Sequence, residues 1–202
     1  MKNKFTKNLP TSQSLPSGVA LNDHNIEFVG VKPTKSVIWL QCGNSHSFDN
    51  LPTTIYIALR DLLSTDIAAV KYLSDNYPEH LDNLPRLVEL YTYYMYGDLD
   101  YTPDVIDGVL QPCENFRDTS DCPSLNFTNK YIDIDGVHLS KRDLVIIDDC
   151  IAGLPDKMIA HKLNIAHSTF DFHKRNLLKK IGADSKTDLI VKSFNNKVVC
   201  AQ

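Results

Sequence analysis

The residues after Gly136 constrain the fold most, because their apolar positions follow the period of a helix. Ser140 is a favourable N-cap, and the acidic Asp143 three residues later gives a variant of the capping box. Gly153 is typical of a residue that ends a helix. These signals predict a first helix between Ser140 and Gly153, whose buried stripe is Leu144, Ile147 and Ile151.

Three more helices are predicted in the same region. The second is short, over about residues 156–163, and a turn at residues 164–165 leads to a longer third helix over about residues 168–181. The fourth follows Ser185. A short helix, a tight turn and a longer basic helix form a helix-turn-helix, and the second of its helices has the right diameter for the DNA major groove.

The third predicted helix has distinct faces. Its inward face is Phe170, Leu177 and Ile181, with His173 or the stem of Lys174. Its outward face holds Asp171, Phe172, Arg175 and Lys179. The lysines at the ends suit contacts with phosphates, and these are Lys174, Lys180 and Lys186.

The charge distribution agrees with this interpretation. The whole chain has a net charge of −4, but the residues from Val137 onward carry 11 Lys and Arg against 7 Asp, which is +4, and the remainder carries −8. An acidic front and a basic back suggest two domains with different partners, of which the basic one is the candidate for nucleic acid.

The segment from Leu139 to Ile190 resembles the LuxR-type helix-turn-helix family. That family's pattern runs Leu-Thr-x-Arg-Glu, Gly, Lys-Glu-Ile-Ala, Leu, Ile-Ser, Thr-Val-Lys, His, Asn-Ile and Lys-Leu-Gly, and the match has no gaps over about a quarter of the chain. The residues that match are Leu139, Arg142, Gly153, Lys157, Ile159, Ala160, Leu163, Ile165, Thr169, His173, Asn176, Lys180 and Gly182. Conservative replacements are Ser140, Asp143, Phe170, Leu177 and Ile181.

The resemblance implies a bacterial transcription regulator that binds duplex DNA. It implies base-edge contacts from the positions of Asp171, Phe172 and Arg175, and phosphate contacts near Thr169, Lys174 and Lys179. It also implies that the last helix, near residues 187–194, pairs two copies into a homodimer. RNA polymerase is a candidate further partner.

Three departures from the family pattern motivate a second hypothesis. Ala166 and Pro155 stand where the family has Ser near helix starts, and Asp171 replaces the groove-facing Lys. A carboxylate near phosphates is unfavourable, although it can accept a hydrogen bond from a cytosine amine. The alternative is therefore a degenerate helix-turn-helix that serves protein–protein contact without binding DNA specifically.

The front of the chain gives weaker signals. Residues 1–30 suggest a flexible tail. The apolar segment 36–42 suggests a buried strand or a short helical turn, followed by a polar loop over residues 43–50. Pro52 opens a helical pattern through Leu73, which is one helix or two helices broken near residues 64–65.

Further helices are predicted beyond Pro78. One spans Leu84 to Tyr96, and a short one begins near residues 102–104 and runs through Val109. Residues 112–129 are loop-like, and residues 131–136 alternate as in a short strand or an extended linker. The tyrosines of this region, Tyr91, Tyr93, Tyr94, Tyr96 and Tyr101, fit either a ligand pocket or a set divided between core and surface.

The expected fold is mainly α. A four-helix LuxR-type domain over residues 137–202 follows a mainly helical α(+β) domain over residues 31–130, which serves as a sensor or in an interaction. No catalytic constellation is visible, so we expect neither enzyme activity nor a cofactor. Since no apolar run nears the ~18 residues of a membrane span and no signal peptide is evident, we expect a cytoplasmic protein without a membrane partner.

The five cysteines are odd in number, and the expected compartment is reducing, so disulfides are not predicted. Four residues have the types of a three-cysteine, one-histidine zinc site, although they lack a close CxxC pair. They are Cys42, His46, Cys113 and Cys122. Buried or free thiols are the simpler interpretation.

Overall fold

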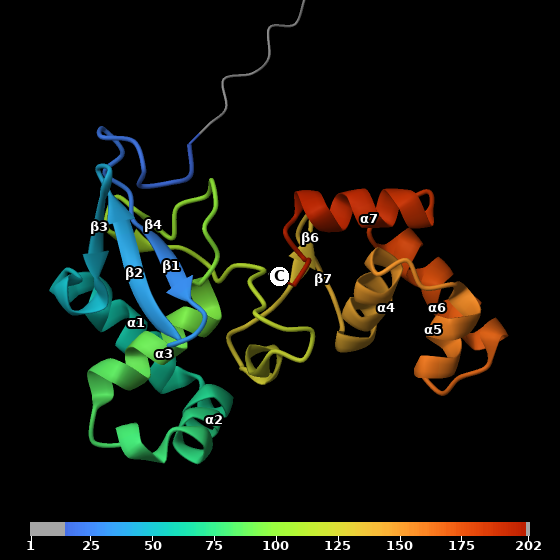
Figure 1. The fold of residues 1–202 in the computed structure, drawn as a ribbon, viewed down its shortest axis with the longest axis horizontal. Coiled ribbons are helices and arrows are strands. Elements are labelled where there is room, and N and C mark those ends of the chain that lie inside the picture. Colours follow the sequence, from blue (N-terminus) through green and yellow to red (C-terminus); the bar gives the residue numbers. More distant parts are fainter. Residues whose placement is uncertain (1–14, 201–202) are drawn as a thin grey trace, which may run out of the picture.

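The computed structural model describes residues 15–200, which form two regions with separate hydrophobic cores. The first core is built from residues between Ile26 and Phe127, and the second from residues between Ile132 and Val198. Figure 1 shows them at opposite ends of an elongated molecule, with the segment that precedes β6 between them.

The N-terminal region is mixed α/β, with small antiparallel sheets. Its main sheet has the order β1-β2-β3, and these strands are Glu27–Val31, Ser36–Gln41 and Asn44–Ser47. A short hairpin follows, made of β4 (Val105–Ile106) with β5 (Val109–Leu110). A second hairpin, made of β6 (Asp133–Ile134) with β7 (Val137–His138), opens the C-terminal region, whose core includes Ile134. The expectation of a mainly helical N-terminal domain is corrected to this mixed arrangement.

Three helices complete the N-terminal region, and they are α1 (Thr53–Thr65), α2 (Ile67–Asn76) and α3 (Leu84–Tyr96). Of the two alternatives for residues 52–73, the structure has two helices with a break near residues 64–65, and the predicted helix over residues 84–96 is confirmed. The strand predicted at residues 36–42 is also confirmed, as β2, whose buried residues are Val37 and Trp39. Short 3-10 turns occur at Phe48–Asn50, Pro78–His80 and Pro123–Asn126.

Two expectations for the N-terminal region differ from the structure. Glu27–Val31 forms β1 and buries Phe28 completely, so the last residues of the expected 1–30 tail belong to the core, whereas residues 1–14 lie outside the described residues. The expected loop at residues 43–50 contains β3, whose polar sequence hides a strand that pairs with β2.

The short helix expected from residues 102–104 through Val109 is wrong, because this segment forms the β4–β5 hairpin. Asp107 and Gly108 both have positive φ, at 50° and 78°, which is the requirement of a type I′ hairpin turn. The same Asp-Gly pair at residues 135–136 turns β6 into β7 and confirms the short strand predicted there.

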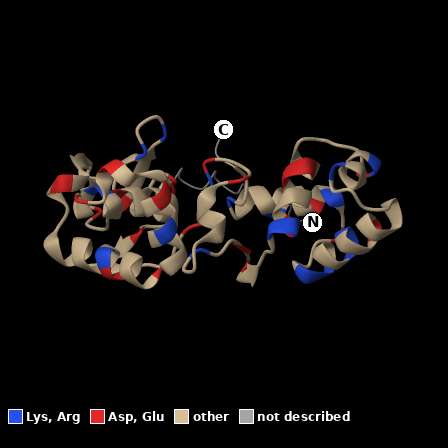
Figure 2. Cartoon of the chain, turned by 90° about the horizontal axis from the view of Figure 1, so that it is seen from below, with Lys and Arg blue, Asp and Glu red and all other residues tan. Residues whose placement is uncertain are grey.

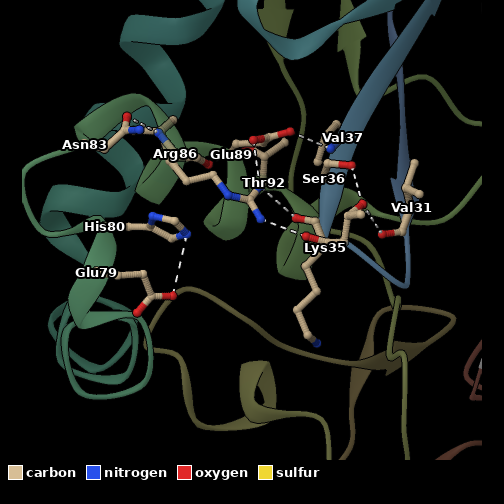
Figure 3. Close-up of polar contacts among 12 residues, drawn as sticks. Val31, Lys35, Ser36, Val37, Glu79, His80, Asn83, Arg86, Glu89 and Thr92 are labelled. Carbon is tan, nitrogen blue, oxygen red and sulfur yellow. Dashed lines mark hydrogen bonds and ion pairs between the residues drawn. The ribbon is translucent and has the colours of Figure 1, made fainter.

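Helix α3 packs against β1 and β2 and is held to the turn between them by polar contacts (Figure 3). Arg86 donates to the carbonyl oxygens of Thr34 and Lys35 at 2.8 and 3.2 Å, and the Glu89 carboxylate accepts from the Val37 amide at 2.9 Å. Gly30 permits this packing, since an added Cβ would lie 2.8 Å from the Tyr93 ring. The buried tyrosines of α3 therefore belong mainly to the core.

Asp66 organises the helical side of the N-terminal region. Its carboxylate is fully buried and caps α2 by accepting from the Ala69 amide at 3.0 Å. It also accepts from the amides of Thr128 and Asn129 at 2.8 and 2.9 Å, and from the Tyr91 hydroxyl at 3.3 Å. One carboxylate thus joins the α1–α2 junction to the segment that leads toward β6.

The C-terminal region contains four helices, as predicted. They are α4 (Lys141–Ile151), α5 (Asp156–Lys162), α6 (His167–Lys180) and α7 (Lys186–Asn195). Gly153 and Gly182 adopt φ values of 75° and 62° after α4 and α6, which ends both helices in the predicted manner.

Replacing the buried Asp66 tests its organising role. Asp66→Ala should lower the free energy of unfolding by about 3–5 kcal/mol, because it removes a charged acceptor and leaves several buried donors unpaired. Urea denaturation measures the change. Asp61→Ala, at an exposed position of α1, should change it by less than about 0.5 kcal/mol, and an equal effect of the two substitutions would contradict this role.

Candidate nucleic-acid interface

The start of α4 is fixed by a complete capping box. The Ser140 side chain accepts from the Asp143 amide at 3.2 Å, and the Asp143 carboxylate accepts from the Ser140 amide at 2.9 Å. The same carboxylate accepts a hydrogen bond from the Lys180 ammonium at the end of α6, at 3.0 Å. The start of α4 is therefore joined to the end of α6.

The turn between α5 and α6 sets the direction in which α6 leaves α5. Asn164 has a positive φ of 52°, and the Ile165 amide donates to the Ala160 carbonyl at 3.0 Å. Ala166 then precedes α6 without a side-chain cap, as the replacement of the family's Ser implies. The turn is thus built from backbone geometry.

The inward face of α6 holds it against the rest of the region. Phe170 is fully buried, and Leu177 and Ile181 are nearly so. Their partners in the second core come from the other three helices and include Leu144, Ile147, Ile159, Ala160 and Leu189. This packing decides which side of α6 faces the solvent.

Four of the six residues predicted to contact DNA lie on the exposed side of α6, and these are Thr169, Phe172, Arg175 and Lys179. They recur every three or four positions, so they share one helix face. Phe172 is 56% exposed, which is unusual for a large aromatic side chain. Arg175 and Lys179 have no ion pair among the described residues.

Lys174 and Asp171, the other two predicted contacts, are engaged within the protein. Lys174 forms a short ion pair with Asp156 of α5, and its ammonium lies 5.6 Å from the centre of the Phe170 ring. The Asp171 carboxylate lies 3.0 Å from His167 Nδ1, one turn earlier on α6. Lys174 therefore faces α5, and its ammonium, 3.8 Å from an Asp171 carboxylate oxygen, compensates part of the charge of Asp171.

The lysines predicted at the ends of α6 are also held by carboxylates. Lys180 pairs with Asp143, and Lys186 donates to the Leu154 carbonyl at 2.8 Å and lies 3.6 Å from Asp156. Ion pairs between different helices cannot be recognised from the spacing along the chain. Figure 2 shows the Lys and Arg segments of this region on several helices.

Sequence reasoning did not single out Arg142, Lys157 or Met158 as possible interface residues. Arg142 is exposed in the first turn of α4, and its Nη1 lies 3.2 Å from Nε2 of the half-buried His173 of α6. Lys157 is exposed in the first turn of α5, and Met158 next to it is 56% exposed. Arg142 and Lys157 were visible only as matches to the family pattern.

The four candidate zinc ligands do not form a cluster among residues 15–200. His46 stacks on Trp39 with ring centres 4.1 Å apart, and Cys42 Sγ lies 3.2 Å from His24 Nδ1. Cys113 contacts the Asn129 carbonyl and Cys122 contacts Ser124. Each predicted ligand thus has separate surroundings, and all five cysteines are free thiols.

Among residues 15–200, none of the helices has both the length and the apolar character that crossing a membrane requires.

A comparison with family models matches residues 137–193 to GerE, described as bacterial regulatory proteins of the luxR family. The matched residues include β7, α4, α5, α6 and most of α7. Comparisons with curated proteins and with solved structures give no match.

The contacts of Asp156 predict how acid affects this region. Burial favours the protonated form, but the hydrogen bond from Lys174 and the charges of Lys174 and Lys186 lower the pKa of Asp156 below its usual value. A lowered folded-state pKa contributes stability above the ordinary value of about 3.9, and that stability is lost as the pH falls through the folded-state pKa.

Asp156→Asn should therefore flatten the loss of stability between neutral pH and about pH 3. Thermal unfolding at several pH values measures it. Asp184→Asn, at an exposed carboxylate without an ion pair among the described residues, should leave the slope unchanged. Identical slopes for Asp156→Asn and the wild type would show that the Lys174–Asp156 pair adds nothing to stability.

Proposed function

We propose that this chain, which carries a LuxR-family helix-turn-helix domain at residues 137–193, regulates transcription by placing α6 in the major groove of duplex DNA. The observation that carries the proposal is the exposed face of α6. It presents Thr169, Phe172, Arg175 and Lys179 together, and its two cations have no ion pair among the described residues.

The side chains of this face suit two kinds of contact, with base edges and with phosphates. The Arg175 guanidinium suits a bidentate contact with the O6 and N7 atoms of guanine, and Phe172 suits apolar contact with a thymine methyl. Thr169 and Lys179 suit contacts with phosphate oxygens, which fix the orientation on the duplex without reading its sequence. We assign Lys174 a supporting role, because it holds α5 against α6 through Asp156.

Asp171 affects both the affinity of the site for DNA and its preference among bases. Its carboxylate lies on the same helix as the two cations, so it reduces attraction to phosphates in general. It can also accept a hydrogen bond from a cytosine amine. The proposed result is weaker non-specific binding, with discrimination added at one base position.

The exposed side of α7 supports the proposal that two copies form a homodimer. Val191 and Phe194 are 50% and 55% exposed on this helix. Burying such side chains between two chains is favourable by roughly 25 cal/mol for each Å² of apolar surface. A dimer would place two copies of α6 on successive half-sites, and the bound regulator would then recruit or block RNA polymerase.

We further propose that residues 31–130, together with Ile26 and strand β1, act as a sensor or interaction domain and residues 137–202 as the DNA-binding domain. Separate hydrophobic cores on either side of residues 128–131 support this division.

The second candidate is a protein–protein contact module that does not bind DNA specifically. Asp171 and the missing side-chain cap of α6 favour it, since both weaken an anion site at the start of the helix. Binding of the full chain to random duplex DNA at low salt separates the two candidates. Complete absence of binding would favour the second.

Removing the two cations of α6 should weaken DNA binding. Arg175→Ala should cost about 1–3 kcal/mol and relax specificity at one base pair, whereas Lys179→Ala should weaken binding evenly across sequences and lower the salt slope by about 1. Fluorescence anisotropy at several salt concentrations measures both. Lys71→Ala on α2 is the matched control. If a variant that carries both Arg175→Ala and Lys179→Ala binds DNA as tightly as the wild type, α6 is not part of the interface.

Asp171→Asn separates its two proposed effects. Affinity for random duplex DNA should rise severalfold, because a negative charge is removed from the face that approaches phosphates. Affinity for a selected target site should rise less or fall, because Asn donates as well as accepts. Equal increases on both DNAs would show that Asp171 takes no part in base discrimination.

A further inference from the structure

Three carboxylates converge in the N-terminal region, away from α6. Glu27 of β1 is fully buried, Asp104 precedes β4 and is 2% exposed, and Glu114 follows β5. One ligand oxygen from each lies within 4.8 Å of the other two. Buried like charges at this separation require protons or a cation to compensate them.

Backbone amides donate hydrogen bonds to only some of the carboxylate oxygens of this cluster. The Asp100 amide donates to Glu27 Oε1 at 2.5 Å, the Phe28 amide to Asp104 Oδ2 at 2.7 Å, and the Asp98 amide to Glu114 Oε2 at 3.2 Å. Within the described part of the chain, Glu27 Oε2 and Glu114 Oε1 are buried and receive no hydrogen bond. Such unpaired oxygens are costly, and they point to a missing positive partner.

The nearby buried lysine does not fill this role. Lys130 is 8% exposed, and its ammonium donates to the carbonyl oxygens of Tyr94 and Met95 at 3.1 Å each. When all three carboxyl groups are ionised, the Lys130 ammonium offsets one of their charges and two remain, which one divalent cation would neutralise.

We propose that Glu27, Asp104 and Glu114 bind one divalent, oxygen-seeking cation of the Ca²⁺ type. Oxygens that share a Ca²⁺ ion at about 2.4 Å can lie up to about 4.8 Å apart, so the cluster needs little rearrangement. Carboxylate oxygens suit Ca²⁺, Mg²⁺ and Mn²⁺, whereas zinc favours sulfur and imidazole ligands.

A hollow of about 500 Å³ gives the cation a route to the cluster. Asp104 and Glu114 line it, and so do Asn195, Asn196 and Lys197 at the end of α7. Lys197 lies 3.4 and 3.1 Å from Asp98 and Asp100, whose amides hold Glu114 and Glu27. The cation would thus stabilise the place where the N-terminal region meets the end of the helix-turn-helix domain, whether or not that domain binds DNA.

Thermal unfolding of the chelator-treated full chain tests the proposal. CaCl₂, MgCl₂ and MnCl₂ are added separately, with KCl at the same ionic strength as the control. At least one divalent ion should raise Tm by roughly 5 °C at a hundredfold excess over its Kd. Calorimetric titration should show one ion per chain. If none of the three ions raises Tm above the KCl control, the proposal is overturned.

Glu114→Gln locates the site. The substitution keeps the shape of the side chain but removes a charge, so cation affinity should fall at least tenfold. Without divalent ions the variant should unfold at the same Tm as the wild type or higher, because repulsion within the cluster is relieved. Glu79→Gln, on the exposed 3-10 turn before α3, is the matched control and should bind normally. Wild-type affinity in Glu114→Gln would overturn the assignment, and the wild-type titration remains decisive if this variant does not fold.

Discussion

A guanidinium without exposed surface provides a fully buried link between the two regions. Arg117 donates to both carboxylate oxygens of Asp148 on α4, at 3.0 and 2.8 Å, and also to the Val198 carbonyl after α7. Phe116 next to it belongs to the N-terminal core. Loss of one partner from a buried pair costs about 3–5 kcal/mol. The position of the helix-turn-helix relative to the sheet therefore depends on this contact.

Further polar contacts at the same junction leave the proposed reading face free. The Asn115 side chain donates to the carbonyls of Asp133 and Asn196 at 2.8 and 2.7 Å, and Lys197 pairs with Asp98 and Asp100. These contacts use β6, α4 and the end of α7, whereas the exposed side of α6 takes no part in them.

The sequence predicted the parts whose signals are local. Caps, glycines and helical periodicity defined α4 to α7, and the exposed position of Arg175 followed from them. Strand β3 was missed because its polar sequence becomes a strand only when paired with β2, and Phe28 was assigned to a tail because its partners lie far along the chain. The ion pair of Lys174 was missed for the same reason, since Asp156 approaches it only in the folded protein.

The central claim is that the exposed side of α6 touches DNA. Replacing Phe172 with a photoreactive benzoylphenylalanine, and Ile57 of α1 likewise as a control, tests it directly, because both side chains are exposed. After irradiation of the full chain with duplex DNA at low salt, the protein altered at residue 172 should crosslink to DNA and the one altered at residue 57 should not. Crosslinking from residue 57 alone, or from neither residue while DNA remains bound, would contradict the account.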